Sequence, residues 1–388
     1  MSRFSVLKVA TAGVLALMPA VLAAQSVTGN DNTGYGTTAA EFLLLGANAR
    51  GMALGGSYAA VATDVGGLNA NPGAVALIKR PAIQGSQLQY VADTKLNWGA
   101  VALPFGGGSS VIGFQIGSFG FSDQPIYTAD QPDGTGAFYS VNETFVAGTI
   151  AKNFSDRFSV GITGKGIIDK LGDVNGSAFA VDFGTHFHSQ LGGRAIRFAF
   201  SLSNLGTNMS YSGEGLNQII ARSSTKDTLP DQHDAVTTGQ PVGYIASSWS
   251  LPTIFRVALA YDIVSTKDAH LTLMSEFNQM RSNRPAFGGG AEFTADHIGG
   301  SGFGIAARGS YSYDPSRSYS NTGFTDAFYT GTGANPGYSK SGDSNAGWAY
   351  GGGAWLASKG GFELGFDYAR RKMGLIGDVD FYTVTLGW

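Results

Sequence analysis

The chain has 388 residues, a formal net charge of −3 and no cysteine, so disulfides, thiol nucleophiles and cysteine metal sites are excluded. Only 14% of the residues are charged, and this balance provides no basic stripe for nucleic acid. Glycine is abundant, with 58 residues, but the glycines keep no three-residue period, which excludes collagen.

Residues 1–24 have the features of a secretory signal peptide. A basic start precedes an apolar stretch over 9–22, and the small pair Ala23-Ala24 comes before the polar Gln25. We expect cleavage after one of these two alanines and export of the mature chain. No later segment contains the roughly 20 consecutive apolar residues of a membrane helix, so membrane insertion would have to use strands.

The segment 25–81 follows no strand pattern and is rich in glycine and alanine. Such a segment either extends into the periplasm or folds into the interior of a barrel. We favour the interior, because a large barrel must fill its lumen with water, a loop or a plug, and small residues let the chain approach the wall closely. The residues that we assign to the motif of this predicted hatch are Gly55, Gly56, Asn71, Pro72 and Gly73.

From residue 82 to residue 388, apolar residues alternate with small or polar ones. Phe362, Leu364 and Phe366, for example, are separated by single polar or small residues. Because successive side chains of a strand point to opposite faces, this pattern predicts one face toward lipid and one toward a wet interior. We therefore predict an all-β fold, an antiparallel transmembrane barrel of about fourteen strands. The predicted strands are 82–91, 94–105, 109–121, 138–153, 157–171, 176–188, 195–205, 252–264, 268–280, 286–297, 301–313, 345–357, 360–371 and 378–388.

The links between these strands differ in length. Bacterial outer-membrane barrels keep periplasmic turns short and extracellular loops long. The long links 122–137, 206–251 and 314–344 all follow odd-numbered strands, whereas short links such as 106–108 and 298–300 follow even-numbered ones. We therefore expect a periplasmic N terminus and long links on the cell surface.

The last strand ends on an aromatic residue. Tyr382, Val384, Leu386 and Trp388 share one face of this strand, and small or polar residues fill the other. An edge strand of a soluble sheet would alternate in the same way, but the signal peptide favours a strand of the bacterial outer membrane. We interpret the four apolar residues as an assembly signal for the barrel-insertion machinery.

Charged side chains fall on the predicted interior face. Alternation places seven of them there: Arg256, Asp262, Glu276, Glu292, Arg308, Glu363 and Asp367. We interpret them as wall charges that pair with one another and with the hatch, because charges kept from lipid need partners or water.

The sequence contains no convincing catalytic or cofactor motif. No Gly-x-Ser-x-Gly lies at a strand-to-helix turn. His186 and His188 share an interior face but lack a third metal ligand. Asp169 and Asp173 precede Asn175 but miss the ligand spacing of a calcium loop, so we interpret them as part of a plain turn. We predict a non-enzymatic protein with no catalytic residues, cofactor, metal or nucleic-acid partner.

Four parts of the chain resemble the PorV/PorQ family. Residues 36–43, 46–64 and 71–73 are similar to the N-terminal region of that family, and 251–256 (Leu-Pro-Thr-Ile-Phe-Arg) are similar to a later block. The family belongs to the FadL-like group of fourteen-stranded outer-membrane barrels with an N-terminal hatch. One departure is that the family usually has bulky aromatics before an Asn-Pro-Ala, whereas Gly-Gly-Leu-Asn-Ala at 66–70 precedes Asn-Pro-Gly here.

The resemblance implies a role in protein secretion. Members of the PorV branch act with the type IX secretion apparatus and hand on substrates at the cell surface. We therefore expect an adaptor or shuttle, with secreted cargo proteins and a secretion translocon as partners in addition to outer-membrane lipid. The alternative is a FadL-like channel that takes up hydrophobic small molecules through a lateral opening. The link 206–251 would be a platform for a partner protein in the first case and a ligand-collecting mouth in the second.

Overall fold

The computed structural model describes residues 36–221, 239–283, 285–313, 347–358, 360–373 and 377–388. The predicted signal peptide and the link 314–344 lie outside the described residues.

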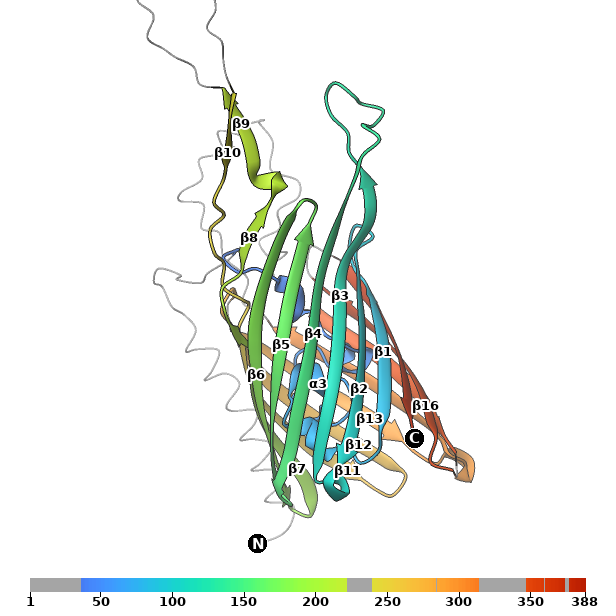
Figure 1. Cartoon of the computed structure of the whole chain (residues 1–388). Helices are drawn as coiled ribbons and strands as arrows, with labels where there is room; N and C mark the ends of the chain where they lie inside the picture. Colours follow the sequence, from blue (N-terminus) through green and yellow to red (C-terminus); the bar gives the residue numbers. More distant parts are fainter. Residues whose placement is uncertain (1–35, 222–238, 284, 314–346, 359, 374–376) are drawn as a thin grey trace, which may run out of the picture. The chain divides into compact units, whose positions relative to one another are not determined.

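Fourteen antiparallel strands close into a barrel, which confirms the predicted fold (Figure 1). Each of these strands pairs with two neighbours, and the ring includes the β1–β17 and β5–β6 pairs. The ring strands are β1 (Ala82–Gln89), β2 (Lys95–Phe105), β3 (Ser110–Pro125), β4 (Phe138–Ser155), β5 (Phe158–Leu171), β6 (Val174–Leu191), β7 (Arg194–Gly206), β11 (Ile254–Ser265), β12 (Ala269–Met280), β13 (Ala286–Ala295), β14 (Phe303–Tyr313), β15 (Gly347–Ala357), β16 (Glu363–Lys372) and β17 (Asp378–Gly387).

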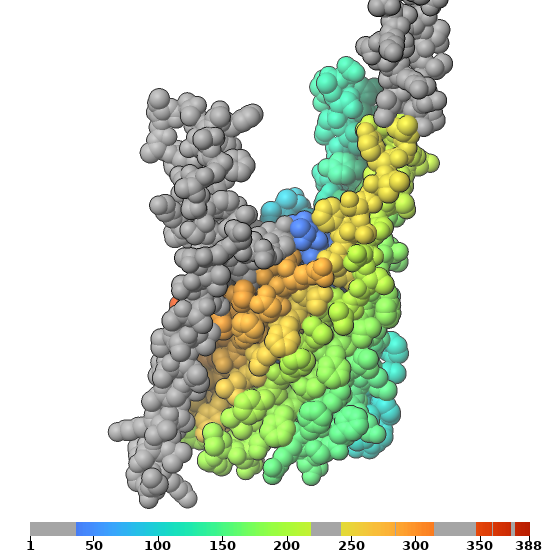
Figure 2. Space-filling model, turned by 90° about the vertical axis from the view of Figure 1, so that its left-hand side faces the viewer, coloured from blue at the N-terminus to red at the C-terminus, as the bar shows by residue number. Residues whose placement is uncertain are grey.

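The wall has an apolar outer face and a buried inner face. On β16, Leu364 and Phe366 are exposed on the outside, whereas Gly365 and Ala369 are buried. Figure 2 shows one side of this outer face, where β7, β11 and β12 run diagonally side by side. The alternation arises because the pleat turns successive side chains to opposite faces.

Short links between strands use glycine where the backbone must turn sharply. Gly106, Gly107 and Gly108 form η3 (Gly106–Gly108) between β2 and β3, and their φ angles are 60°, 69° and 81°. Residues with a side chain rarely adopt this left-handed region, so three consecutive glycines allow a very short connection. A similar short turn, η5 (Ile298–Gly300), joins β13 to β14.

The link 206–251 is more structured than the single loop that we expected. It contains β8 (Ser210–Gly213), which pairs with β6, the short turn η4 (Glu214–Leu216), and the antiparallel pair of β9 (Asn217–Ala221) and β10 (Gly239–Gly243). Strands of four or five residues are too short to show a clear alternation in sequence. In Figure 1 this part of the chain rises beyond the end of the wall.

Residues 36–81, here called the N-terminal segment, fold into short helical turns. These are η1 (Glu41–Leu44), α2 (Ala49–Ala53), α3 (Gly67–Ala70) and η2 (Ala74–Leu77). The side chain of Asn48 caps α2 by accepting a hydrogen bond from the backbone N–H of Gly51 at 2.9 Å. Among the described residues, no helix is long and apolar enough to cross a membrane.

Candidate functional site

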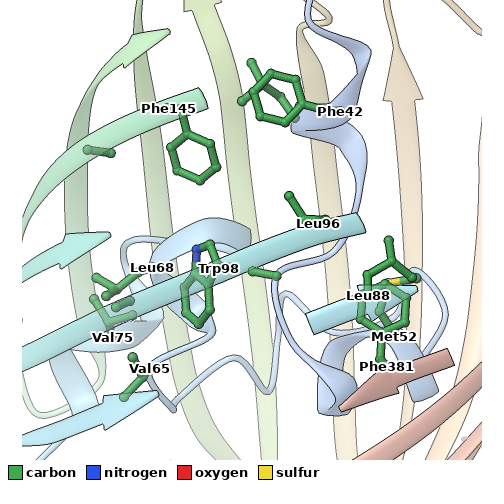
Figure 3. Packing of buried hydrophobic residues seen from close by; sticks show 14 of the residues in the cluster. Phe42, Met52, Val65, Leu68, Val75, Leu88, Leu96, Trp98, Phe145 and Phe381 are labelled. Carbon is green, nitrogen blue, oxygen red and sulfur yellow. The ribbon is translucent and has the colours of Figure 1, made fainter. Parts of the chain in front are cut away.

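The N-terminal segment packs against the inner face of the wall through a hydrophobic cluster (Figure 3). The ring of Phe42 lies 6.1 Å from the ring of Phe145 on β4, measured between centroids. Leu68 is fully buried against Gly113 of β3, where an added Cβ would come within 2.3 Å of the leucine side chain. Leu68 therefore fits against the wall because Gly113 has no side chain.

The Asn71-Pro72-Gly73 motif packs against two glycines of the wall. A Cβ on Gly161 of β5 would lie 2.2 Å from the carbonyl oxygen of Pro72. A Cβ on Gly184 of β6 would lie 2.2 Å from Oδ1 of Asn71. The backbones of the segment and the wall approach so closely that only glycine fits at both wall positions.

The side chain of Asn71 fixes this contact. Its Nδ2 donates to the carbonyl oxygens of Ala59 and Thr185, both at 3.1 Å, and its Oδ1 accepts from the N–H of Gly73 at 3.1 Å. Asn71 is completely buried, so each of these bonds replaces one to water. The motif therefore has a docking role in the structure.

Gly55 and Gly56 form a second close approach. Their φ angles are 51° and 84°, which favours glycine at both positions. A Cβ on Gly288 of β13 would lie 2.3 Å from the carbonyl oxygen of Gly56, and that oxygen accepts a hydrogen bond from Asn278 at 3.2 Å. This turn therefore contacts the inner face at β13, four strands along the ring from the Asn71 contact on β6.

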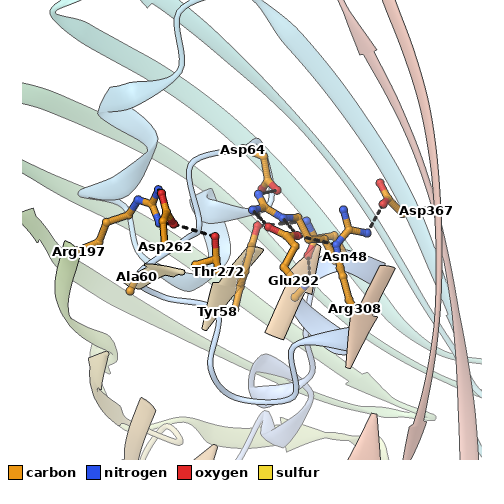
Figure 4. A network of polar contacts seen from close by, with 12 residues as sticks. Asn48, Tyr58, Ala60, Asp64, Arg197, Asp262, Thr272, Glu292, Arg308 and Asp367 are labelled. Atoms are coloured by element: carbon orange, nitrogen blue, oxygen red, sulfur yellow. Dashed lines mark hydrogen bonds and ion pairs between the residues drawn. The ribbon is translucent and has the colours of Figure 1, made fainter. Parts of the chain in front are cut away.

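An ion-pair network links the N-terminal segment to three strands (Figure 4). Arg50 donates to both carboxylate oxygens of Glu292 at 2.8 Å and to Asp64 at 2.8 Å. Arg308 donates to the same Glu292 at 2.6 Å and also to Asp367. The predicted wall charges Glu292, Arg308 and Asp367 thus lie together, with Arg50 as their partner from the segment.

Tyr58 extends this network within the segment. Its hydroxyl donates to Asp64 and lies within hydrogen-bond distance of Asn48. Burial raises the pKa of the Tyr58 phenol, and the negative charge of Asp64 raises it further. The phenol therefore stays protonated and remains a donor to the carboxylate.

A second group of wall charges contacts the segment farther along the wall. Nε of Arg256 lies 3.9 Å from Oε1 of Glu276, and Arg256 also donates to Ser203 at 3.0 Å. Glu276 accepts the backbone N–H of Ala59 at 2.8 Å. These two wall residues form a group separate from the Arg50 network.

The remaining predicted charges lie elsewhere. Asp262 accepts two hydrogen bonds from Arg197, both at 2.8 Å, and one from Thr272 at 2.8 Å. Glu363 lies half-buried at the first residue of β16 and belongs to none of these groups.

A chamber of about 650 Å³ lies between the N-terminal segment and the inner face of the wall. Its apolar lining includes Leu44, Met52, Met280 and Phe287, and its polar lining includes Arg256, Glu276, Asn278 and Ser312. The chamber lies within the size range of small-molecule sites, about 300–1,000 Å³. Among the described residues, Oδ1 of Asn278 is buried beside this chamber without a hydrogen-bond partner.

The four residues that we assign to the assembly signal lie on β17 or directly after it. Tyr382, Val384 and Trp388 are exposed on the outer face, and Leu386 is half-buried there. β17 pairs with β1 on one side and β16 on the other, and the backbone N–H of Trp388 donates to the carbonyl oxygen of Pro81 at 3.1 Å. This strand therefore joins the two ends of the barrel sequence.

His186 and His188 lie side by side on β6, with ring centroids 5.9 Å apart. His186 is fully buried, and its Nε2 lies 3.1 Å from the carbonyl oxygen of Ala60 in the segment. Within the part of the chain that the structure describes, no group of three or more His, Asp or Glu side chains converges.

Sequence reasoning missed Arg50, Asp64 and Lys165 as interior charges. Lys165 is buried on β5, where its Nζ lies 3.0 Å from Asp182 and 2.8 Å from the side-chain oxygen of Asn204. The alternation of β5 contains the signal for Lys165, since Thr163 and Ile167 on either side of it are also buried. Arg50 and Asp64 lie outside any strand, and no periodicity identifies them.

No family model and no curated protein match this chain. Among solved structures, the chain is similar to a Pseudomonas aeruginosa FadL homologue, with 9% identity over 88% of this chain and 98% of that one, and a TM-score of 0.46. It is also similar to the CymD monoaromatic hydrocarbon channel, with 10% identity, 89% and 97% coverage and a TM-score of 0.48. The Ralstonia pickettii toluene transporter TbuX gives 9% identity, 88% and 97% coverage and a TM-score of 0.47. At sequence identities this low, the similarity concerns the fold alone.

Proposed function

We propose that this protein is a non-enzymatic, FadL-like channel of the bacterial outer membrane that admits hydrophobic small molecules, with the N-terminal segment as its hatch. The observation that supports the proposal best is the chamber between the segment and the wall, which brings apolar side chains together with polar and charged ones. In binding sites for small molecules, apolar area supplies affinity and polar groups fix orientation.

The outer face of the barrel supports the membrane location. Large apolar side chains are exposed on neighbouring strands around the ring, for example Phe114 on β3, Val146 on β4 and Val384 on β17. A closed ring leaves no strand edge unpaired, which a β-structure needs in order to cross lipid. An apolar exterior of this extent is unfavourable in water and favourable in a bilayer.

The chamber favours a ligand with a long apolar body and a small polar end. Leu44, Met52 and Met280 offer flexible apolar contacts. Asn278 offers an acceptor with no partner among the described residues, and Arg256 lines the chamber with its Nε 3.9 Å from Glu276. A hydroxyl or carboxyl end would therefore find partners beside the apolar surface.

A pair of matched substitutions tests the proposal. Ala286 lines the chamber on β13, and Ala307 lies exposed on the outer face of β14. In proteoliposomes that take up a fluorescent fatty-acid analogue, Ala286→Phe should reduce the uptake rate at least tenfold, because the ring fills the chamber. Ala307→Phe adds the same ring to the lipid face and should leave uptake unchanged. Equal uptake by the two variants would contradict the channel.

The second candidate function is the secretion adaptor that the PorV/PorQ resemblance implies. The observation that favours it is a group of exposed apolar residues in the link 206–251: Tyr244, Ile245 and Trp249, of which Ile245 is 98% exposed. Exposed apolar groups outside the membrane belt suit contact with a partner protein. Shortening this link, with barrel assembly intact, should abolish capture of a secreted protein, and substitutions at Asn71 and Pro72 should not. The reverse result would remove the adaptor and favour the channel.

A further inference from the structure

Two carboxylates face each other near the β5–β6 turn, and the described part of the chain places no cation beside them. Glu143 on β4 pairs directly with Asp169 on β5, and both side chains point to the inner face. Directly opposite residues of an antiparallel pair have Cβ atoms about 4.5–5.5 Å apart, where two like charges destabilise the sheet. The arrangement therefore needs a compensating group.

Asp169 is the more unusual of the two. It is fully buried, and its Oδ1 has no hydrogen-bond partner among the residues that the structure describes, while its Oδ2 accepts from the hydroxyl of Tyr211 at 2.8 Å. Buried carboxylates are normally paired with a cation or bound to a metal, because desolvation of an isolated charge is costly. A positive ion would supply the partner that this buried oxygen lacks.

The described residues offer no side-chain cation for this position. The nearest lysine along the inner face of β5 is Lys165, which is already held by Asp182 at 3.0 Å and by Asn204 at 2.8 Å. Lys170 is next to Asp169 in sequence, but it is exposed on the outer face opposite Asn142. No ion pair of Glu143 or Asp169 is present among the described residues.

Tyr211 contacts the carboxylate pair from a strand outside the ring. It comes from β8, which pairs with the start of β6 outside the ring. The phenol reaches Asp169 over Gly176, where an added Cβ would lie 2.8 Å from the Tyr211 ring. Burial raises the pKa of Tyr211, and its bond to Asp169 raises it further, so the hydroxyl stays protonated as a donor. β8 is therefore tied to the wall at the carboxylate pair.

We propose that Glu143 and Asp169 form a binding site for a divalent cation next to Tyr211, and that the preferred ion is Ca²⁺. The site offers only oxygen atoms, which hard cations prefer over the nitrogen and sulfur ligands of transition metals. Two carboxylates neutralise the two charges of the ion, and water or carbonyl oxygens complete its shell. With so few protein ligands the affinity falls in the weak range of extracellular calcium modules, a Kd of about 10⁻⁴–10⁻³ M. Binding would fasten the structured link 206–251 to the barrel, whatever ligand the chamber takes.

Isothermal titration of the purified full-length barrel with CaCl₂ tests the site, with NaCl at equal ionic strength as the reference. We expect one calcium site, at least tenfold weaker in Glu143→Gln and in Asp169→Asn. Glu363→Gln removes an inner-face carboxylate that belongs to none of the networks above, and this control should bind as the wild type does. Absence of binding to the wild type, or equal binding by both site variants, would overturn the proposal.

A second measurement does not depend on how well the carboxylate variants assemble. Tb³⁺ substitutes for Ca²⁺ and emits when a nearby tyrosine is excited. Tyrosine-excited emission from wild-type protein should fall when calcium is added, and Tyr211→Phe should reduce it several-fold. If emission persists in Tyr211→Phe and resists calcium, the ion lies elsewhere. If the wild type binds no calcium and Glu143→Gln raises its Tm, the two carboxyls share a proton and the cation site is wrong.

Discussion

Replacing Arg50 by methionine tests how the N-terminal segment is held in the barrel. The side chain of Arg50 is 20% exposed and that of its partner Glu292 is 7% exposed, so the pair is largely desolvated. Loss of one partner from a buried pair costs about 3–5 kcal/mol, because the other charge is left uncompensated. Glu292 keeps its bond to Arg308, which places the expected cost near the lower end, about 3 kcal/mol.

Because the chain contains no cysteine, the labelling rate of a single introduced cysteine can report how often the segment leaves the wall. Ala59 is 1% exposed and borders the chamber, so a cysteine placed there has room for its sulfur and is protected while the segment is docked. A loss of about 3 kcal/mol would raise the undocked population roughly 100-fold, since each 1.4 kcal/mol is about a factor of ten. We therefore expect maleimide to label Ala59→Cys about 100-fold faster in the Arg50→Met background.

The matched control is Arg370→Met, the same change on the outer face of β16. Arg370 bonds to Asp380 of the adjacent strand, and its side chain faces outward, away from the segment. Labelling at position 59 should keep its wild-type rate in this variant. If Arg50→Met labels no faster than Arg370→Met, the ion pair does not hold the segment and the reasoning is wrong.

Three further predictions concern the wall and its assembly. Leu364→Arg should lower the free energy of unfolding from lipid by about 2–4 kcal/mol in a urea titration. Gly365→Ser should lower the free energy of unfolding much less, because its added Cβ lies no closer than 3.7 Å to any neighbouring atom. A larger loss for Gly365→Ser than for Leu364→Arg would show that the register is shifted by one residue. Trp388→Ser should reduce the amount of assembled barrel, and unchanged outer-membrane levels with unchanged heat-modifiable gel mobility would rule out the assembly role. Gly184→Ala should displace Asn71 and weaken docking of the segment by about 1–3 kcal/mol. The introduced cysteine of the segment should then be labelled faster. An unchanged labelling rate would show that the glycine contact is dispensable.

The sequence predicts the wall well because the physics of a membrane strand is local. One apolar face and one small or polar face give a period of two that is visible at Leu364 and Phe366 without knowledge of any neighbour. The same argument fails for β8, since four residues show no period and its pairing with β6 depends on the path of a long link. The link between β5 and β6 has two residues instead of the four that the predicted strands leave there, because Gly172 at φ 60° permits a tight turn.

The site was predictable only in part. Alternation identifies Glu292 and Arg308 as interior residues, but their partner Arg50 lies in a segment without periodicity. Asn71 stood out by its motif, yet its role depends on two glycines that are far away in sequence and meet it only in the folded barrel. The chamber arises from the fit between the segment and the wall, and no single stretch of sequence encodes it.

The most direct test of the channel is to identify what the protein holds when it is extracted gently from native outer membrane. Mass spectrometry of the wild-type protein and of the Ala286→Phe variant would report bound small molecules and co-purifying proteins in one experiment. We expect a hydrophobic small molecule in near-stoichiometric amount with the wild type and its loss from the variant that fills the chamber. A stoichiometric exported protein, with no small molecule that distinguishes the two forms, would contradict the channel.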